Sequence, residues 1–269
     1  MKIANHSVLI TGGASGIGKI MGRMALEKGA RCLIIWDINE QSIETVKAEH
    51  SRLGKVYGYK VDVSDVEAVK AAYAKTVEDC GQVDILINNA GIVTSNRLFV
   101  DNTYEEIERT LRINSAAPMY VALTVLKDMV SRDSGHICNI ASAAGMLAVP
   151  RMSAYVASKW ANVGWSESVR IELQDSGSKV QFTTVAPYFI NTGMFDGVES
   201  KIFPILKPEK TSKKIIKAIE KGKETKGIPF PFHFIRMCEF IFPMRIFDWF
   251  FGEVFGIYHV MDHFTGRKK

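Results

Sequence analysis

The chain has 269 residues, of which 47% are hydrophobic and 23% are charged, and its net charge is +5. This length suffices for one large α/β domain, and the composition is ordinary for a globular protein. We expect no nucleic-acid partner, because the modest positive charge comes without an aromatic or recognition-helix pattern.

Short apolar runs alternate with helical patterns over the first two-thirds of the chain. Strands are expected at 7–11, 32–36, 56–61, 85–88, 136–140 and 180–185, and helices at 17–28, 40–53, 65–79, 103–130 and 153–174. The strand runs do not alternate between apolar and polar residues, which is typical of strands buried on both faces. This order predicts a single domain with a Rossmann-type, doubly wound parallel sheet of about seven strands. Pro118 is expected to bend the fourth helix.

A glycine-rich turn follows the first expected strand and opens the first helix. It reads Thr11-Gly12-Gly13-Ala14-Ser15-Gly16-Ile17-Gly18. Glycines let the backbone turn sharply and approach a pyrophosphate, and the start of the helix offers free N–H groups. Such a turn alone is weak evidence, but here it has the required strand–turn–helix context. We expect a dinucleotide to contact Gly12, Ser15, Gly16, Ile17 and Gly18.

Asp37 ends the second expected strand, nineteen residues after Gly18. A carboxylate there can accept hydrogen bonds from the adenosine ribose hydroxyls and would repel a 2′-phosphate. No Arg or Lys follows closely, so we expect NAD(H) rather than NADP(H). Alternatively, Asp37 caps a helix or forms a turn, although Asn39 could serve as that cap.

Two further polar segments end the third and fourth expected strands. They are Asp62-Val63 and Asn88-Asn89-Ala90-Gly91. Ligands of open parallel sheets lie beyond the carboxyl ends of the strands. We therefore expect Asp62, Val63, Asn89, Ala90 and Gly91 near the adenine and along the floor of the cofactor site. The alternative is that both segments are plain turns.

Tyr155 and Lys159 lie four residues apart on an expected helix, thirteen residues after Ser142. This spacing places the phenol and the ammonium on one helical face. A nearby cation favours the phenolate and lowers the pKa of a tyrosine, which would allow proton transfer near neutrality. Alone, the pair is a weak pattern, since Tyr155 could be a packed aromatic and Ser142 a strand-end hydroxyl.

Together these motifs resemble those of the classical short-chain dehydrogenase/reductase family over about residues 5–195. The shared motifs are Thr-Gly-x-x-x-Gly-Ile-Gly at 11–18, Asn-Asn-Ala-Gly at 88–91, Asn114, Ser142, Tyr155-x-x-x-Lys159 and the segment Pro187 to Thr192. A narrower resemblance is to the branch that contains retinol dehydrogenases and 17-beta-hydroxysteroid dehydrogenases. It is carried by 33–39, 141–145, 185–188, 191–195 and the apolar C-terminus.

The resemblance implies hydride transfer between a nicotinamide and an alcohol or ketone. It implies that Tyr155 exchanges a proton with the substrate oxygen and that Ser142 hydrogen-bonds this oxygen. Lys159 would lower the pKa of Tyr155 and hold the nicotinamide ribose, and Asn114 would support a proton-relaying water.

The same resemblance assigns the carboxamide end of the cofactor to Pro187, Ile190 and Thr192. Family members commonly form dimers or tetramers through the helices expected at 103–130 and 153–174, so a homo-oligomer is implied. Two other interpretations remain open: a catalytically silent nucleotide-binding scaffold, and an NADP(H)-dependent carbonyl reductase of the same family.

Apolar residues after Ser142 and Pro187 are expected to wall the substrate site. We expect substrate contacts from Ser142, Met146, Met152, Tyr188, Met194 and Phe195. Such walls suit a lipophilic alcohol or ketone, namely a steroid, a retinoid or a long-chain alcohol. Alternatively, these residues only pack the loop. Residues 193–227 are expected to form a substrate loop and a helix at 211–222.

The segment 228–269 is expected to hold the last strand and an apolar, helical C-terminal extension. Its aromatic residues are Phe230, Phe232, Phe234, Phe240, Phe242, Phe247, Trp249, Phe250, Phe251, Phe255 and Tyr258. Charges and Pro243 interrupt this stretch, so no transmembrane helix is expected. We expect the extension to pack on the domain or on a second subunit. A peripheral membrane contact through 228–261 is the second interpretation.

The remaining expectations concern the redox state of the cysteines, metal binding, targeting segments and a lysine-rich stretch. The four cysteines show no CxxC spacing, and Cys32 and Cys138 lie in strand-like runs, so we expect reduced thiols and a cytoplasmic location. The six histidines show no metal-binding spacing, and we expect no metal. The first strand begins after about seven residues, so we expect no signal peptide or N-terminal anchor. Nine lysines at 201–226 are read as a solvated face, with attraction to an acidic membrane as the alternative.

Overall fold

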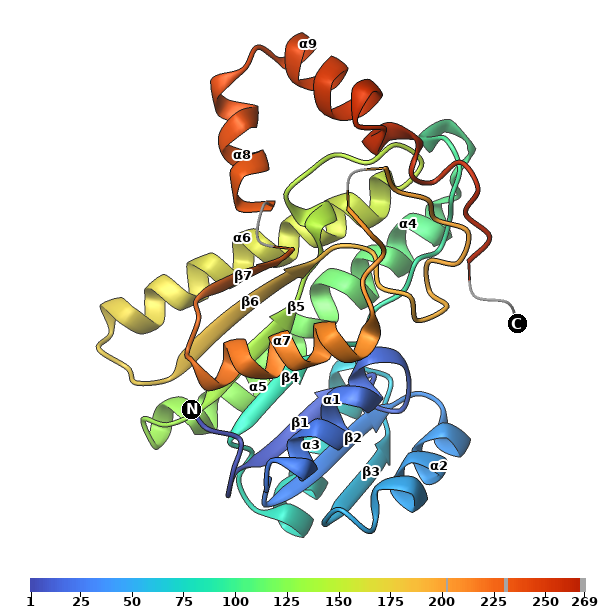
Figure 1. The fold of residues 1–269 in the computed structure, drawn as a ribbon. Coiled ribbons are helices and arrows are strands. Elements are labelled where there is room, and N and C mark those ends of the chain that lie inside the picture. Colours follow the sequence, from blue (N-terminus) through green and yellow to red (C-terminus); the bar gives the residue numbers. More distant parts are fainter. Residues whose placement is uncertain (202, 230–231, 267–269) are drawn as a thin grey trace.

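A parallel sheet of seven strands forms the centre of the computed structural model, which describes residues 1–201, 203–229 and 232–266 (Figure 1). The strands are β1 (Ser7–Thr11), β2 (Cys32–Asp37), β3 (Val56–Lys60), β4 (Ile85–Asn88), β5 (His136–Ile140), β6 (Gln181–Pro187) and β7 (Thr225–Ile228). Their order is β3-β2-β1-β4-β5-β6-β7, and every neighbouring pair is parallel. The expected Rossmann-type architecture is confirmed, and the strand order reverses direction between β1 and β4.

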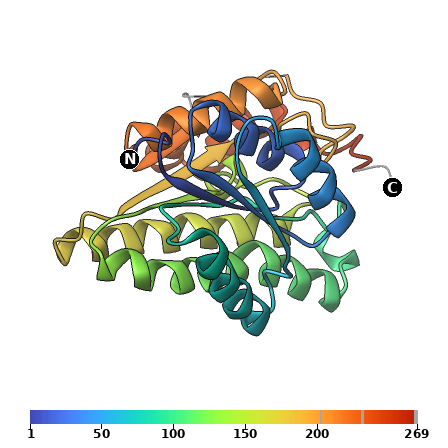
Figure 2. The same ribbon diagram turned by 90° about the horizontal axis from the view of Figure 1, so that it is seen from below.

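Helices cover both faces of the sheet (Figure 2). One face carries α1 (Gly16–Glu27), α2 (Glu40–His50) and α7 (Pro208–Glu220), and the other carries α3 (Val66–Cys80), α5 (Ala117–Ser131) and α6 (Ser153–Asp175). Each layer buries its own apolar core against the sheet. Because β1, β2, β4 and β5 are covered on both sides, nearly all of their side chains are buried. This double burial explains the continuous apolar runs of the sequence.

The helix starts are capped by short polar side chains. Asn39 accepts a hydrogen bond from the Ser42 N–H at 2.9 Å at the start of α2. Asp65 does the same at the start of α3, and Thr103 forms a capping box before α4 (Tyr104–Leu111). These caps satisfy N–H groups that have no partner within the helix. The role of Asn39 leaves Asp37 available for other contacts.

The fourth expected helix is interrupted rather than smoothly bent. A π-helical turn, η2 (Arg112–Ala116), separates α4 from α5, and Pro118 lies in the first turn of α5. A proline has no N–H and its ring collides with the carbonyl four residues earlier, here that of Asn114. The Asn114 carbonyl instead accepts a hydrogen bond from Asn162 Nδ2 at 2.7 Å. The proline therefore sets the position of the break near a residue of the predicted site.

The C-terminal region differs from the expectation in the place of its strand. The last strand, β7, ends at Ile228, whereas we expected it after this residue. It lies at the edge of the sheet, where a short strand containing lysine and glycine is tolerated. The chain continues through α8 (Phe232–Ile241), α9 (Met244–Phe247) and the turns η4 (Asp248–Val254) and η5 (Ile257–His259). Phe230 lies outside the described residues, and the extension is helical, as expected.

The helical pair α8 and α9 projects from the body of the molecule (Figure 1). No helix in the described part of the chain is both long and apolar enough to cross a membrane. Cys32, Cys80, Cys138 and Cys238 carry free thiols, as expected. Among the residues that the structure describes, no group of three or more His, Cys, Asp or Glu side chains is placed to hold a metal ion.

Candidate active site

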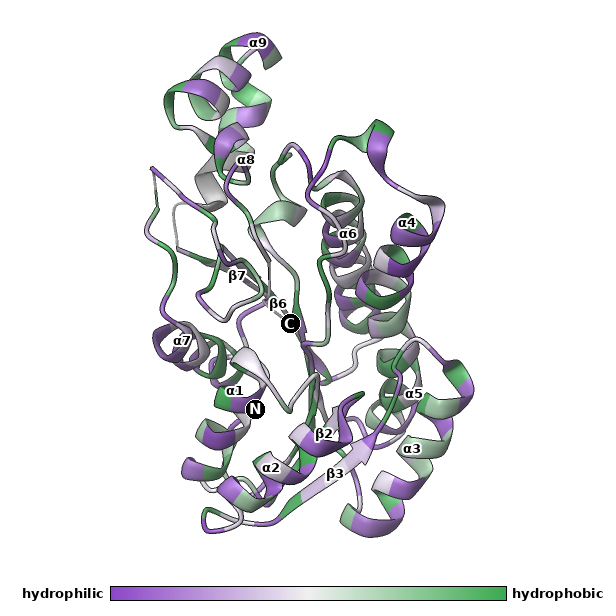
Figure 3. Cartoon of the chain, turned by 90° about the vertical axis from the view of Figure 1, so that its right-hand side faces the viewer, coloured by the Kyte–Doolittle hydropathy of each residue, from purple (hydrophilic) through white to green (hydrophobic). Residues whose placement is uncertain are grey.

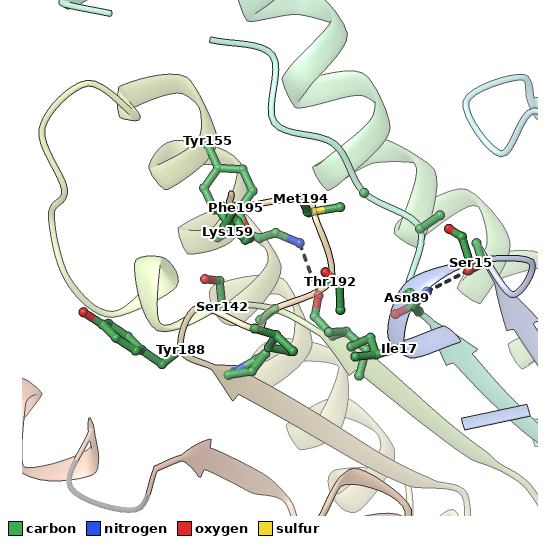
Figure 4. A pocket seen from close by; sticks show the side chains of 18 residues that line it. Ser15, Ile17, Asn89, Ser142, Tyr155, Lys159, Tyr188, Thr192, Met194 and Phe195 are labelled. Carbon is green, nitrogen blue, oxygen red and sulfur yellow. Dashed lines mark hydrogen bonds between the residues drawn. The ribbon is translucent and has the colours of Figure 1, made fainter. Parts of the chain in front are cut away.

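A cavity of about 160 Å³ opens at the carboxyl ends of the central strands (Figure 4). Its walls bring together predicted residues from segments that are distant in the sequence. They are Gly12, Ser15, Gly16, Ile17, Asn89, Ala90, Gly91, Ser142, Tyr155, Lys159, Pro187, Tyr188, Ile190, Thr192, Met194 and Phe195. The glycine-rich turn lies at one end of this cavity and Tyr155 at the other. The place matches the position at which open parallel sheets bind ligands.

The glycine-rich turn is held against the end of β4 without room for side chains. A Cβ atom on Gly18 would lie 2.3 Å from the Gly12 carbonyl oxygen, and Gly12 itself has a φ of +62°. Asn89 Nδ2 donates to the carbonyls of Thr11 and Gly12 at 3.0 and 3.1 Å. The backbone thus forms a bare, rigid surface at the start of α1, where N–H groups face the cavity. These residues fit a dinucleotide pyrophosphate.

Asp37 supports this turn from the end of β2. Its carboxylate accepts hydrogen bonds from the Ala14 N–H at 3.0 Å and the Asn39 N–H at 3.1 Å. A carboxylate has about four acceptor positions, so capacity remains for ribose hydroxyls. Asp37 therefore combines the expected turn role with a position suited to the adenosine end.

Four of the predicted cofactor residues do not line the cavity. They are Gly18, Asp37, Asp62 and Val63. Asp62 accepts hydrogen bonds from the N–H and the hydroxyl of Ser64, and Val63 packs in the core on the α3 side of the sheet. Both residues follow β3, two strands away from the β1–β4 junction. Their contact with the adenosine of a cofactor therefore stays a prediction.

Tyr155 and Lys159 project from α6 into the other end of the cavity, and both side chains are buried. Lys159 Nζ lies 5.6 Å from the centre of the Tyr155 ring and donates to the Ile140 carbonyl at 3.2 Å. Ser142 lies across from the phenol, where its hydroxyl influences the pKa of Tyr155. A Cβ atom on Gly91 would lie 3.7 Å from Lys159 Nζ. The ammonium thus reaches the cavity floor where the β4 motif ends.

Burial governs the protonation of this pair. It raises the pKa of Tyr155 to about 12, and the Ser142 hydroxyl opposes the rise. Burial also lowers the pKa of Lys159 to about 8. This differs from our expectation that Lys159 lowers the pKa of Tyr155, because removal from water disfavours the charged form of both groups. Tyr155 is therefore a neutral phenol at neutral pH and is ready to donate a proton.

An apolar chamber of about 30 Å³ adjoins the cavity beyond Ser142 and Tyr155. Its walls are Ser142, Ala143, Ala144, Leu147, Val149, Tyr155, Tyr188, Phe189, Phe195, Ile257 and Val260. Met146 and Met152, which we expected among the walls, are buried but line neither space. The short helix η3 (Ala143–Gly145) turns the chain after Ser142 and brings Leu147 and Val149 to the chamber instead. Sequence reasoning missed Ile257 and Val260, for which no motif gives a signal.

A family model described as "short chain dehydrogenase" matches residues 6–202. The chain belongs to the short-chain dehydrogenase family. The match covers the glycine-rich turn, the Ser142–Tyr155–Lys159 group and the Pro187 segment, so this dehydrogenase is an NAD(P)-dependent alcohol dehydrogenase or ketone reductase.

Two named relatives place the dehydrogenase in the expected branch. Epidermal retinol dehydrogenase 2 of Mus musculus is 34% identical, over 99% of this chain and 87% of the relative. Estradiol 17-beta-dehydrogenase 11 of Rattus norvegicus is 33% identical, over 91% of this chain and 83% of the relative. The crystal structure of levodione reductase has a TM-score of 0.76 at 24% identity, over 84% of this chain and 96% of that one, and shows the same fold.

Asn114 of the dehydrogenase lies below the cavity floor, fully buried in the π-helical turn η2. Its Oδ1 accepts from the Ile92 N–H at 2.8 Å, and its Nδ2 donates to the Ile92 carbonyl at 2.9 Å. The same Nδ2 donates to Ser158 Oγ at 3.2 Å. Asn114 therefore joins the β4 motif to α6, the helix of Tyr155 and Lys159.

Proposed function

We propose that this dehydrogenase transfers a hydride between NAD(H) and a lipophilic alcohol or ketone of the steroid, retinoid or long-chain class. The observation that carries the proposal is the sharing of Ser142 and Tyr155 by two adjoining spaces. One contains polar groups as well as apolar walls and leads to the glycine-rich turn, and the other is almost entirely apolar. The names of the relatives, a retinol dehydrogenase and an estradiol dehydrogenase, support this substrate class.

Tyr155 and Ser142 handle the substrate oxygen in this proposal. When bound, the nicotinamide supplies or accepts the hydride. The Tyr155 hydroxyl gives its proton to the carbonyl oxygen during reduction or takes it back during oxidation. Ser142 donates a hydrogen bond to the same oxygen, and Lys159 binds the nicotinamide ribose. Asn114 holds Ile92 and thereby positions the floor beside Gly91, and the expected water relay through Asn114 stays a prediction.

The cofactor would lie along the floor from the turn to Lys159. Its pyrophosphate would contact Gly12, Ser15, Gly16 and Ile17, with Gly18 shaping the turn, and its middle would cross Asn89, Ala90 and Gly91. Its carboxamide end would contact Pro187, Ile190 and Thr192, and its adenosine would lie beside Asp37, Asp62 and Val63. The nicotinamide would then lie beside Tyr155 and Lys159.

The apolar chamber would receive the carbon skeleton of the substrate. Its volume of about 30 Å³ is far below the ~300–1,000 Å³ of ordinary ligand sites. Most of its walls come from residues 142–155 and 188–195, which follow β5 and β6. Ile257 and Val260 belong to the C-terminal extension, so we propose that they move outward when substrate enters, beside Met194 and Phe195.

The choice of NAD(H) depends on Asp37. Initial rates with NAD and NADP, measured side by side for a panel of lipophilic alcohols, test it. We expect NAD to be preferred by more than about tenfold, because a 2′-phosphate would meet the Asp37 carboxylate. Asp37→Asn removes this charge and keeps an acceptor for the Ala14 N–H. It should reduce the ratio of the rate with NAD to the rate with NADP. Higher turnover of the native chain with NADP would overturn the proposal.

We also propose a homodimer or homotetramer built through α4, α5 and α6. Leu123 on α5 and Ile171 on α6 expose large apolar side chains on these helices. Paired copies would bury them. Light scattering of the purified chain measures the mass, and a monomer would contradict this assignment.

A further inference from the structure

Two segments that are distant in the sequence expose large apolar side chains at the same end of the molecule. One is the loop that precedes α4, and the other is the helical hairpin of α8, α9 and η4 (Figures 1 and 3). The loop exposes Leu98, Phe99 and Val100, and the first residue of α4 adds Tyr104. The hairpin exposes Met237, Phe240, Ile241, Met244, Trp249 and Val254. We call these residues the apolar end; Val100 is 86% and Phe240 is 87% exposed.

On one face of the hairpin, aromatic side chains pack against one another. Phe247 is buried and stacks on Phe251 with a ring separation of 4.6 Å, and Phe250 packs on Phe255 at the same separation. The other face carries the exposed residues of the apolar end. Proteins seldom expose this many large apolar side chains on one segment unless the segment binds a partner or a membrane.

The apolar end is connected to the chamber wall. Asn96, next to the loop, donates from Nδ2 to the Met261 carbonyl at 2.9 Å. Ile257 and Val260 follow the hairpin directly and line the chamber. Whatever covers the apolar end therefore lies beside the wall that must move for a large substrate.

The charge beside the hairpin indicates what this partner is. A groove of about 320 Å³ between α7 and β7 is lined by Lys214, Lys217, Lys221, Lys223 and Lys226, and none of the described residues that line it is acidic. Strand β7 leads into α8 and packs against it. Basic residues beside an amphipathic apolar surface favour a membrane with anionic headgroups.

We propose that the apolar end docks on an anionic lipid bilayer, with Phe240, Trp249 and Val100 entering the interface and the lysine groove facing the headgroups. A second part of this proposal rests on the proposed function: the lipophilic substrate reaches the chamber from the membrane, past Ile257 and Val260.

Co-sedimentation of the full chain with vesicles tests the docking without any turnover. Vesicles of phosphatidylcholine with and without phosphatidylserine serve as probes. We expect binding that increases with phosphatidylserine. Phe240→Glu with Trp249→Glu, and separately Val100→Glu, should each weaken it at least tenfold. Leu53→Glu, an exposed apolar position outside the apolar end, is the matched control and should leave binding unchanged. Equal binding by all variants would overturn the proposal.

Two further measurements test the lysine groove and the hairpin independently. Lys217→Glu and Lys221→Glu should each weaken binding to phosphatidylserine vesicles about fivefold while leaving phosphatidylcholine binding unchanged. Lipids brominated in the acyl chain should quench Trp249 fluorescence in the native chain, and absence of quenching would contradict insertion of the hairpin.

The oligomeric state distinguishes a membrane from a second copy. If the native chain fails to bind vesicles and the Phe240→Glu, Trp249→Glu variant has a smaller mass in solution, copies of the chain cover the apolar end and the proposal is wrong. If vesicles bind but no alcohol or ketone is turned over, the proposed function fails while the docking stands.

Discussion

The two ends of the active site, the cofactor end at the glycine-rich turn and the substrate end at the apolar chamber, differ in what forms their walls. At the cofactor end, backbone lies against backbone, and a single added carbon at Gly18 would collide with the Gly12 carbonyl. At the substrate end, apolar side chains from residues 143–149, 188–195 and 257–260 pack around a small chamber. The first end is therefore fixed by the backbone, whereas the shape of the second depends on individual side chains. Tyr155 lines both the cavity and the adjoining apolar chamber.

Removal of the Tyr155 hydroxyl should have the largest effect, because both ends depend on it for turnover. We expect Tyr155→Phe to lower kcat by roughly 10²–10⁴-fold, the usual contribution of proton transfer. The affinity for NADH, measured by fluorescence titration, should stay within about twofold because the other cofactor contacts remain. Retained turnover would show that another group carries the proton.

A single added methyl group should disrupt the tight backbone packing of the cofactor end. Gly18→Ala should lower the free energy of unfolding by roughly 3 kcal/mol, as overpacking against rigid backbone does, and should weaken NADH binding. Gly164→Ala in α6 is the matched control, since its new Cβ meets nothing within 4 Å. It should raise stability by about 0.5–1 kcal/mol because glycine is unfavourable within a helix. Equal effects of both changes, measured by urea unfolding, would contradict the comparison.

Lys159 should lower the free energy of unfolding of the cofactor-free protein, although the proposed reaction needs it to bind the nicotinamide ribose. Its pKa is lowered from 10.5 to about 8 by burial, so the folded chain binds fewer protons than the unfolded chain between these values. The free energy of unfolding therefore rises with pH from about 8 to 10.5. Lys159→Met should stabilise the protein at pH 7 by on the order of 2 kcal/mol, with the gain shrinking toward pH 10, and should abolish turnover. Unfolding curves at both pH values measure this, and a destabilised variant would contradict it.

The substrate end should respond to small changes without affecting the cofactor. Val260→Ala removes two methylene equivalents and should raise KM for a lipophilic alcohol about tenfold, and Ile257→Val about fourfold. The KM for NAD should not change, because neither residue lines the cofactor cavity. A parallel rise in both KM values would mean that the two ends are coupled.

The cofactor end could be predicted from the sequence because its chemistry lies in contiguous motifs. Strands buried on both faces produce continuous apolar runs, and the residues that follow them meet at one edge of the sheet. Motif order and spacing alone therefore suffice to place Gly12, Asn89 and Tyr155 in one site. The expectations for Asp37, Asp62 and Val63 were open to a plain turn role as well. Asp37 supports the glycine-rich turn, and none of the three lines the cavity.

The substrate end could not be predicted in the same way because it depends on tertiary packing. Met146 and Leu147 are adjacent and both apolar, and only the turn at η3 decides which one reaches the chamber. Ile257 and Val260 lie more than a hundred residues from Ser142 and carry no motif. The pKa of Tyr155 depends on burial, which a spacing of four residues does not reveal. Strand β7 was misplaced because lysine and glycine interrupt its apolar character.

The most direct test of the central claim follows the hydride itself. A lipophilic secondary alcohol deuterated at the carbinol carbon is incubated with NAD and the dehydrogenase, and the reduced cofactor is analysed by mass spectrometry. We predict that deuterium appears in NADH with the native chain and not with Tyr155→Phe. Tight NADH binding with no transfer of label from any steroid, retinoid or long-chain alcohol would contradict the account.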